Sequence, residues 1–258
     1  MNTDTTRDAS LALACLDLTS LNDNDDAAAI DALCARALGP AGRPAALCVW
    51  PRFVAQARAA LPPSIRIASV ANFPDGALDT GRALRDAHAI LAAGGDEVDL
   101  VLPWRALAAG DAAGAAALVA AVRAACTGKT LKLIIESGDL SSSELIRQAC
   151  QIGLDAGVDF LKTSTGKTPA GATPVAARVM LESMAGHARK GVTGFKASGG
   201  VRTVADAAIY IALIREILGE SALGPQRLRF GASGLLADIE SALLRHEGPG
   251  KAAAAGDY

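Results

Sequence analysis

Eight short apolar runs alternate with Ala-rich segments of helical period along the chain, and this alternation limits the fold more than any other feature. Most runs begin about thirty residues apart, the length of one strand with its crossover helix and loops. Apolar strands alternating with helices are typical of a parallel sheet covered by helices. The runs are LACLDLT (13–19), ALCVWP (46–51), RIASVANF (66–73), EVDLVLP (97–103), LKLIIES (131–137), DFLKTST (159–165), TGFKASG (193–199) and LRFGAS (228–233).

This number of units favours a closed (β/α)8 TIM barrel over an open, doubly wound sheet. The 258 residues fit one such α/β domain. A dinucleotide-binding sheet requires GxGxxG after its first strand, whereas LDLTSLND has no glycine. We expect a barrel over residues 1–247 and a flexible tail over 248–258, which is too small and polar to pack. Helices are expected over 25–38, 79–92, 113–126, 141–153, 174–188 and 204–218, with caps at Asp25, Ser141 and Thr173.

Composition excludes several classes of partner. The formal net charge is −2 and basic residues form no block, so nucleic acid is not expected as a partner. The polar N-terminus lacks the basic region of a secretory signal, and the apolar stretch that follows is too short to span a bilayer. Five cysteines without a CxxC pair and three scattered histidines predict neither disulfides nor a metal site. We therefore expect a cytoplasmic enzyme with no metal and no membrane partner.

Three of the seven lysines, Lys132, Lys162 and Lys196, fall inside apolar runs. Lys162 and Lys196 are 34 residues apart, one strand–helix unit, which places them at a similar height on adjacent strands. Two ammonium groups in a pocket of low dielectric constant lower each other's pKa, as an amine nucleophile requires. A structural ion pair is the alternative for either lysine alone. Two on consecutive strands, each leading into a Gly-containing loop, favour an amine nucleophile.

Other polar residues in the runs are candidates for supporting roles. Asp99 alternates with apolar neighbours and is expected inside the barrel, and Asp17 has a similar setting. Either could balance an internal lysine or move protons. Lys132 and Glu136 share a strand face, which predicts an internal ion pair of structural rather than catalytic importance. Cys48 is either a small core residue or part of the pocket.

Three glycine-bearing turns follow the last strands of the predicted barrel. They are Thr165–Lys167, Ser198–Gly200 and Gly231–Gly234. In these barrels the active site forms at the C-terminal ends of the strands, and loops after the seventh and eighth strands often bind phosphate through backbone N–H groups. The convergence of three such turns, with Lys167 beside them, predicts a phosphorylated substrate.

Motifs in every unit resemble the deoxyribose-phosphate aldolase family, from about residue 11 to residue 240. They are LDLTSLNDND, CVWPRF, VANFPDG, GGDEVDLVLPWRAL, FLKTSTGK, GFKASGGVRT and FGASGLL. The resemblance implies a metal-independent, cofactor-free lyase that reversibly cleaves 2-deoxy-D-ribose 5-phosphate into D-glyceraldehyde 3-phosphate and acetaldehyde. It also implies a homodimer.

The family's motifs assign roles residue by residue. The resemblance implies that Lys162 forms a Schiff base, that Lys196 tunes it and shares a proton relay with Asp99, and that Tyr258 reaches the site as a proton donor. The residues implied to bind substrate are Asp17, Cys48 and Thr165 at the sugar, and Gly166, Lys167, Gly199, Gly200, Gly231 and Ser233 at the phosphate.

Three departures from the family pattern bear on affinity rather than on the chemical step. Ala197-Ser198 replaces a common Pro-Ala, Gly234 replaces a second serine, and Ser137 replaces a frequent threonine.

Two alternative functions stay open. One is a Schiff-base aldolase for another phosphorylated sugar, and the other is a phosphosugar-binding barrel without catalysis.

Overall fold

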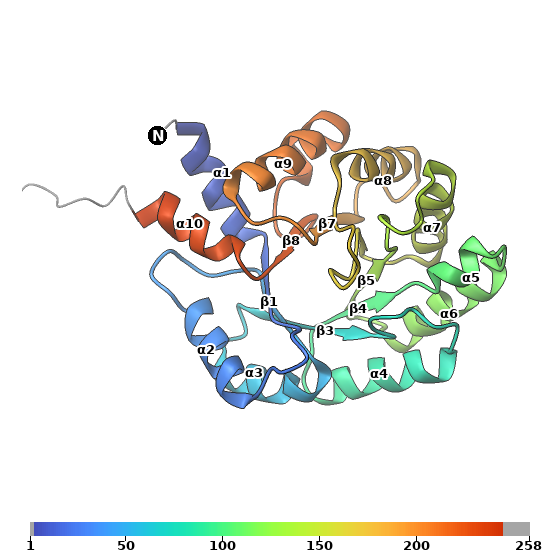
Figure 1. Ribbon diagram of the computed structural model, residues 1–258, viewed down its shortest axis with the longest axis horizontal. Helices are drawn as coiled ribbons and strands as arrows, with labels where there is room; N and C mark the ends of the chain where they lie inside the picture. Colours follow the sequence, from blue (N-terminus) through green and yellow to red (C-terminus); the bar gives the residue numbers. More distant parts are fainter. Residues whose placement is uncertain (1–2, 245–258) are drawn as a thin grey trace, which may run out of the picture.

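Eight parallel strands close into one barrel in the computed structural model, which describes residues 3–244 (Figure 1). Each strand pairs with the next along the chain, and β8 pairs with β1. The predicted (β/α)8 barrel is therefore confirmed. The strands are β1 (Leu16–Thr19), β2 (Ala46–Val49), β3 (Arg66–Ala71), β4 (Glu97–Val101), β5 (Thr130–Ile134), β6 (Phe160–Lys162), β7 (Gly194–Ser198) and β8 (Leu228–Ala232).

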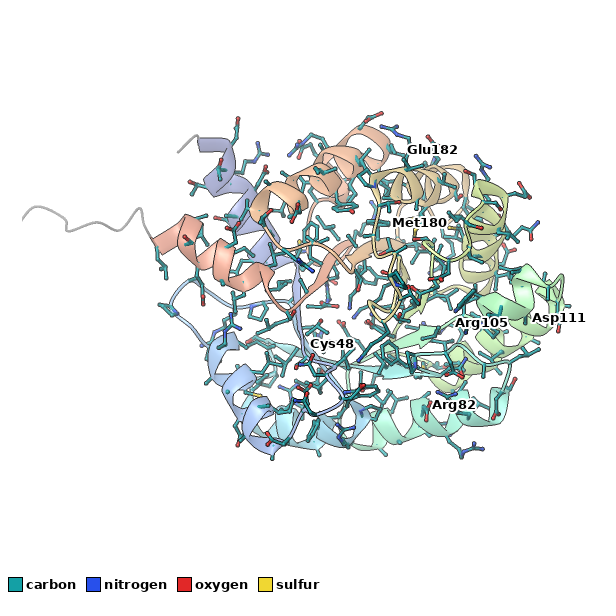
Figure 2. The ribbon with its side chains drawn as sticks, viewed as in Figure 1. Cys48, Arg82, Arg105, Asp111, Met180 and Glu182 are labelled. Atoms are coloured by element: carbon teal, nitrogen blue, oxygen red, sulfur yellow. The ribbon has the colours of Figure 1, made fainter. Side chains whose placement is uncertain are left out.

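Helices surround the barrel, and polar side chains such as Asp111 and Glu182 lie on their outer surface (Figure 2). All six predicted helices are present, the last with the predicted ends and the other five with one or both ends shifted. The helices are α1 (Thr3–Ala14), α2 (Ala27–Ala37), α3 (Val54–Ala60), α4 (Thr80–Ala92), α5 (Trp104–Ala108), α6 (Ala112–Ala125), α7 (Ser143–Ala156), α8 (Pro174–Gly186), α9 (Val204–Leu218) and α10 (Leu235–Leu244), with short 3-10 turns η1 (Pro51–Phe53) and η2 (Glu220–Ala222).

Two of the three predicted helix caps are wrong by one residue. Asp26, not Asp25, accepts a hydrogen bond from the first turn of α2. Ser142, not Ser141, caps α7, because Ser141 has a φ of +48° and cannot lead directly into a helix. Thr173 caps α8 as predicted, with Pro174 in its first turn.

The polar N-terminal segment forms α1, which the sequence did not predict. Its buried face consists of Ala9, Ala12 and Leu13, and it packs against α9 and α10. Only these few small residues mark its apolar face, and tertiary contacts hold the helix more than its own pattern does. Residues 248–258, including Tyr258, lie outside the described residues. Between residues 3 and 244, the structure contains no helix long and apolar enough to cross a membrane.

The barrel interior is divided into an apolar part and a charged part. The main apolar core lies between the strands and the helices. A smaller apolar cluster inside the barrel includes Cys48, Val70 and Ile134. On β4, Glu97 and Asp99 are buried away from the outer core, whereas Val98 and Leu100 belong to it. The predicted inward placement of Asp99 is therefore confirmed.

Candidate active site

Seven buried charged side chains meet inside the barrel, and we call them the buried charge cluster. They come from six strands and are linked by ion pairs. Every side chain of the cluster is at most 6% exposed. The members are Asp17 (β1), Glu97 and Asp99 (β4), Lys132 (β5), Lys162 (β6), Lys196 (β7) and Arg229 (β8).

Asp99 joins the two lysines that the sequence singles out. Its Oδ2 atom lies 2.8 Å from Lys162 Nζ and 2.8 Å from Lys196 Nζ. Lys162 and Lys196 are in register on β6 and β7, as their spacing predicted. Lys162 is the last residue of its strand, at the end where the active sites of such barrels form.

Asp17 and Lys132 connect the remaining members of the cluster. Asp17 Oδ2 lies 2.5 Å from Lys196 Nζ and 2.9 Å from Lys132 Nζ, and its Oδ1 lies 2.6 Å from Arg229. Lys132 also lies 2.6 Å from Glu97 Oε2 and 2.9 Å from Asp99 Oδ1. The predicted pair of Lys132 with Glu136 is wrong, because barrel closure brings three other carboxylates to this amine.

Glu136 instead supports the loop that follows β6. Its two carboxylate oxygens accept from the backbone N–H of Thr165 at 3.2 and 3.3 Å, and one also accepts from the Thr168 hydroxyl at 3.4 Å. The residue has a φ of +53° just after β5, which turns the carboxylate toward that loop. Burial raises its pKa, and the hydrogen bonds from Thr165 oppose this shift.

The pKa values of Lys162 and Lys196 are shifted in opposite directions. Burial and the neighbouring charge of Lys196 lower the pKa of Lys162, and Asp99 only partly offsets them. Burial also acts to lower the pKa of Lys196, but contacts with Asp17 and Asp99 outweigh it and raise that pKa. The expectation that both pKa values fall is therefore wrong for Lys196. Only Lys162 is driven toward the neutral amine.

Asp99 stays ionised and Cys48 stays a neutral thiol. Burial would raise the pKa of Asp99, but contact with Lys132, Lys162 and Lys196 holds it well below its ordinary value. Burial raises the pKa of the Cys48 thiol, which therefore stays neutral inside the barrel (Figure 2).

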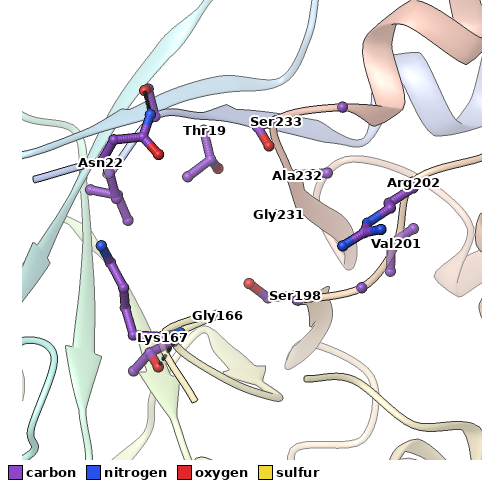
Figure 3. A pocket seen from close by; sticks show the side chains of 16 residues that line it. Thr19, Asn22, Gly166, Lys167, Ser198, Val201, Arg202, Gly231, Ala232 and Ser233 are labelled. Atoms are coloured by element: carbon purple, nitrogen blue, oxygen red, sulfur yellow. Dashed lines mark hydrogen bonds between the residues drawn. The ribbon is translucent and has the colours of Figure 1, made fainter. Parts of the chain in front are cut away.

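A cavity of about 300 Å³ opens at the C-terminal ends of the strands (Figure 3). The three predicted glycine turns converge on it. Asp17 and Cys48, expected in the sugar pocket, are buried in the barrel and do not line this cavity. The predicted catalytic residues Lys162, Lys196 and Asp99 are also buried and do not line it. Predicted residues that line it are Thr165, Gly166, Lys167, Gly199, Gly200, Gly231 and Ser233.

Glycine is required at several of these positions. Gly166, Gly199 and Gly200 have φ values of +76°, +82° and +88°, a region that residues with side chains rarely adopt. At Gly231 an added Cβ would lie 2.8 Å from Ser198 Oγ and 2.9 Å from Lys196 Cε. The close approach of β8 to Lys196 therefore needs a residue without a side chain.

Two cations lie on opposite sides of the cavity (Figure 3). Lys167 Nζ lies 3.1 Å from Asp23 Oδ1 and 5.7 Å from the centre of the Trp50 ring. Arg202 also lines the cavity and was not predicted, although it belongs to the GFKASGGVRT motif. Cations and glycine turns around one cavity form a site suited to a phosphate group.

No group of three histidine, cysteine, aspartate or glutamate side chains within residues 3–244 is arranged to hold a metal ion. The arrangement can instead supply an amine nucleophile, ionised proton carriers beside it and an anion-binding rim.

Comparison with known proteins places this site in a family. The DeoC/LacD family aldolase model matches residues 11–238. A deoxyribose-phosphate aldolase from Agrobacterium fabrum is 45% identical over 248 residues, 95% of each chain. A solved structure from Coccidioides immitis, assigned as a deoxyribose-phosphate aldolase, has a TM-score of 0.79 and 28% identity over 90% of this chain and 85% of its own. The tetrameric deoxyribose phosphate aldolase of Aeropyrum pernix shares the fold, with a TM-score of 0.71 and 22% identity over 93% of this chain and 97% of its own.

The family model spans the whole barrel, and the relative from Agrobacterium matches it nearly end to end. The resemblance seen in the motifs is therefore confirmed at the level of the family. The chain belongs to the DeoC/LacD family of aldolases.

Proposed function

We propose that the protein is a deoxyribose-phosphate aldolase that cleaves 2-deoxy-D-ribose 5-phosphate reversibly through a Schiff base on Lys162. The products are D-glyceraldehyde 3-phosphate and acetaldehyde. The observation that carries the assignment of the nucleophile is the unequal number of carboxylates around two adjacent lysines. Lys162 touches only Asp99 and has a lowered pKa, whereas Lys196 touches Asp17 and Asp99 and has a raised one, so Lys162 loses its proton more readily than Lys196.

The phosphate anchors the substrate at the rim of the cavity. Lys167 and Arg202 supply positive charge, and the turns at Gly166, Gly199 and Gly200 bring the backbone close to the ligand. Lys167 exchanges its contact with Asp23, which is 91% exposed, for the phosphate group. An exposed ion pair of this kind is worth about 1 kcal/mol or less, so the exchange costs little.

Covalent chemistry begins at the aldehyde carbon of the open-chain sugar. The neutral amine of Lys162 adds to this carbon to give a carbinolamine, whose hydroxyl takes a proton from Lys196 and leaves as water, and an iminium ion remains. The bond between the second and third carbons then breaks, and its electron pair moves into the iminium ion to form an enamine. The hydroxyl on the third carbon loses its proton and becomes the aldehyde of glyceraldehyde 3-phosphate.

Proton transfer completes the cycle. The enamine takes a proton on its terminal carbon, and water then hydrolyses the resulting iminium ion to acetaldehyde and free Lys162. Asp99 and Lys196 are the groups beside the amine that can carry these protons, because one carboxylate oxygen touches both amines at 2.8 Å. Lys196 remains a proton donor because Asp17 and Asp99 stabilise its charge.

The decisive experiment combines turnover with covalent trapping. Purified protein should release glyceraldehyde 3-phosphate from 2-deoxyribose 5-phosphate, and borohydride with acetaldehyde should label Lys162, as mapped by peptide mass spectrometry. Lys162→Ala should abolish both while the far-ultraviolet circular dichroism spectrum stays unchanged. Lys190→Ala, at a surface lysine, is the matched control and should behave as wild type. Labelling that persists in Lys162→Ala and maps to Lys196 or Lys167 would refute the assignment.

The alternatives give different results in the same assay. Trapping at Lys162 without cleavage of this sugar, but with cleavage of another phosphorylated sugar, would indicate an aldolase of different specificity. Binding of the sugar phosphate without trapping or turnover would indicate a non-catalytic barrel.

We also propose an assembly and a location for the enzyme. We expect a homodimer in the cytoplasm, whereas the structural neighbour from Aeropyrum pernix is a tetramer. Analytical ultracentrifugation of the full chain distinguishes the two assemblies.

A further inference from the structure

The buried charge cluster contains one more cation than carboxylates. Its carboxylates are Asp17, Glu97 and Asp99, and its cations are Lys132, Lys162, Lys196 and Arg229. An uncompensated charge is costly in a buried site of low dielectric constant. The cluster therefore favours the loss of one proton from one cation.

The contacts within the cluster decide which cation loses the proton. Lys132 touches three carboxylates, and Lys196 and Arg229 touch two each. Arg229 is a guanidinium, which keeps its proton in proteins. Lys162 touches only Asp99, whose charge Lys132 and Lys196 share. Lys162 is therefore the cation that the carboxylates stabilise least.

Arg229 and Glu97 lie in the part of the cluster away from Lys162. Arg229 donates to Glu97 Oε1 at 2.9 Å and to Glu97 Oε2 at 3.1 Å, and its Nε donates to the Pro225 carbonyl at 2.5 Å. Glu97 is the first residue of β4, two positions before Asp99. Neither residue lines the cavity of the glycine turns, and Lys162 does not line it either. They reach Lys162 only through other members of the cluster.

We propose that Arg229 and Glu97 are positioning residues that set the net charge of the buried cluster and thereby keep Lys162 unprotonated from the opposite end of the barrel. The proposal rests on the proposed function of Lys162 as nucleophile. Because Arg229 is one of the four cations, three carboxylates cannot pair them all, and Lys162 is the cation left over. Glu97 is one of those three carboxylates, so without it the cluster would carry two excess positive charges. The lowered pKa of Lys162 agrees with this arrangement.

The remaining titratable groups near Lys162 are the same in the wild type and in the variants that test the proposal. Cys48 faces it from β2 as a neutral thiol, because burial raises its pKa. Glu136 faces it from beyond β5 but hydrogen-bonds to Thr165 and makes no ion pair among the described residues. Both are unchanged when Arg229 or Glu97 is replaced.

Three variants separate a charge effect from a structural one. Arg229→Met removes one cation, Glu97→Gln removes one carboxylate, and the double variant restores the original net charge. At an effective dielectric constant of about 20, a unit charge about 10 Å away moves a pKa by about one unit. The midpoint for Lys162 should therefore rise by about one pH unit in Arg229→Met and fall in Glu97→Gln. It should return to the wild-type value in the double variant.

The readout is the pH dependence of Lys162 modification by potassium cyanate, which reacts with unprotonated amines, followed by peptide mass spectrometry. This readout does not depend on aldolase turnover. Wild-type protein that reacts with cyanate at Lys162 but traps no acetaldehyde would refute the proposed function alone. Midpoints that stay unchanged, or that move in one direction in both single variants, would refute the role of Arg229 and Glu97.

Loss of folding is tested separately. Thermal unfolding identifies variants that are not folded at the assay temperature. Arg229→Lys keeps the charge and should keep the midpoint even if stability falls. If Arg229→Met does not fold, Glu97→Gln and the double variant still decide, because they must differ by about one pH unit. Equal midpoints in these two variants would overturn the proposal.

Discussion

Replacing Lys196 by methionine tests the electrostatic origin of the Lys162 nucleophile most directly. Lys196→Met removes the ammonium that shares Asp99 Oδ2 with Lys162. Two effects then act in the same direction. Lys162 loses a repelling neighbour, and it gains a larger share of the Asp99 carboxylate, so its pKa should rise.

The magnitude follows from the geometry around Asp99. Both Nζ atoms lie 2.8 Å from the same oxygen, so they are at most twice that distance apart, about 5.6 Å. At an effective dielectric constant of about 20, two unit charges at that separation repel by about 3 kcal/mol, or about two pKa units. The folded Lys162 amine should therefore lose its proton about two pH units higher in the variant.

The assay is the pH profile of kcat/KM for 2-deoxyribose 5-phosphate, whose acidic limb reports the free amine. The limb should move toward alkaline pH, so that activity near pH 7 falls by up to about 10²-fold and partly recovers at higher pH. A lower plateau at every pH would report the separate loss of Lys196 as proton carrier. Lys167→Met is the matched control, since it should raise KM without moving the limb. An acidic limb that stays in place in Lys196→Met would refute the reasoning.

Three further outcomes are expected. Activity should survive exhaustive chelation by EDTA, and a loss that zinc restores would contradict the Schiff-base mechanism. Glu136→Gln should weaken the hydrogen bonds that hold Thr165 and Thr168 in place beside the cavity. KM for the sugar phosphate should then rise by up to about tenfold, which corresponds to the free energy of one hydrogen bond. Acetaldehyde trapping at Lys162 in that variant should stay at the wild-type level. Deleting residues 257–258 should slow turnover and proton exchange on acetaldehyde by about 10²-fold while sparing trapping, and equal turnover would leave Tyr258 without a role.

The architecture could be predicted because its signal is local. Each apolar run marks one strand, and alternation within EVDLV places Asp99 on the inner face without knowledge of any other strand. The equal height of Lys162 and Lys196 follows from one repeat of the strand–helix unit. The N-terminal helix α1 lacked such a signal, because its buried face depends on contacts with α9 and α10.

The electrostatics of the site could not be predicted because their causes lie far apart in the chain. Arg229 contacts Asp17 across 212 residues, and Lys132 contacts Asp17 across 115. Face alternation shows that these groups point inward, but not which carboxylate meets which amine. Strand parity predicted a shared face for Lys132 and Glu136, but β5 ends at Ile134 and the carboxylates that contact Lys132 come from β1 and β4. The sign of the Lys196 pKa shift depends on the same distant contacts.

The position of the charge cluster is compatible with both a stable barrel and the reactive amine that we propose at Lys162. Replacing buried ion pairs by well-packed apolar side chains is often neutral or stabilising, so the cluster is weak evidence for stability. The outer core between strands and helices is apolar, and so is the barrel interior around Cys48 and Val70. Charged side chains therefore occupy the rest of the interior, and the strands do not depend on them for stability. Because the strands are fixed by the outer core, the cluster cannot relax its excess charge by moving apart. In the mechanism that we propose, deprotonation of Lys162 removes this excess.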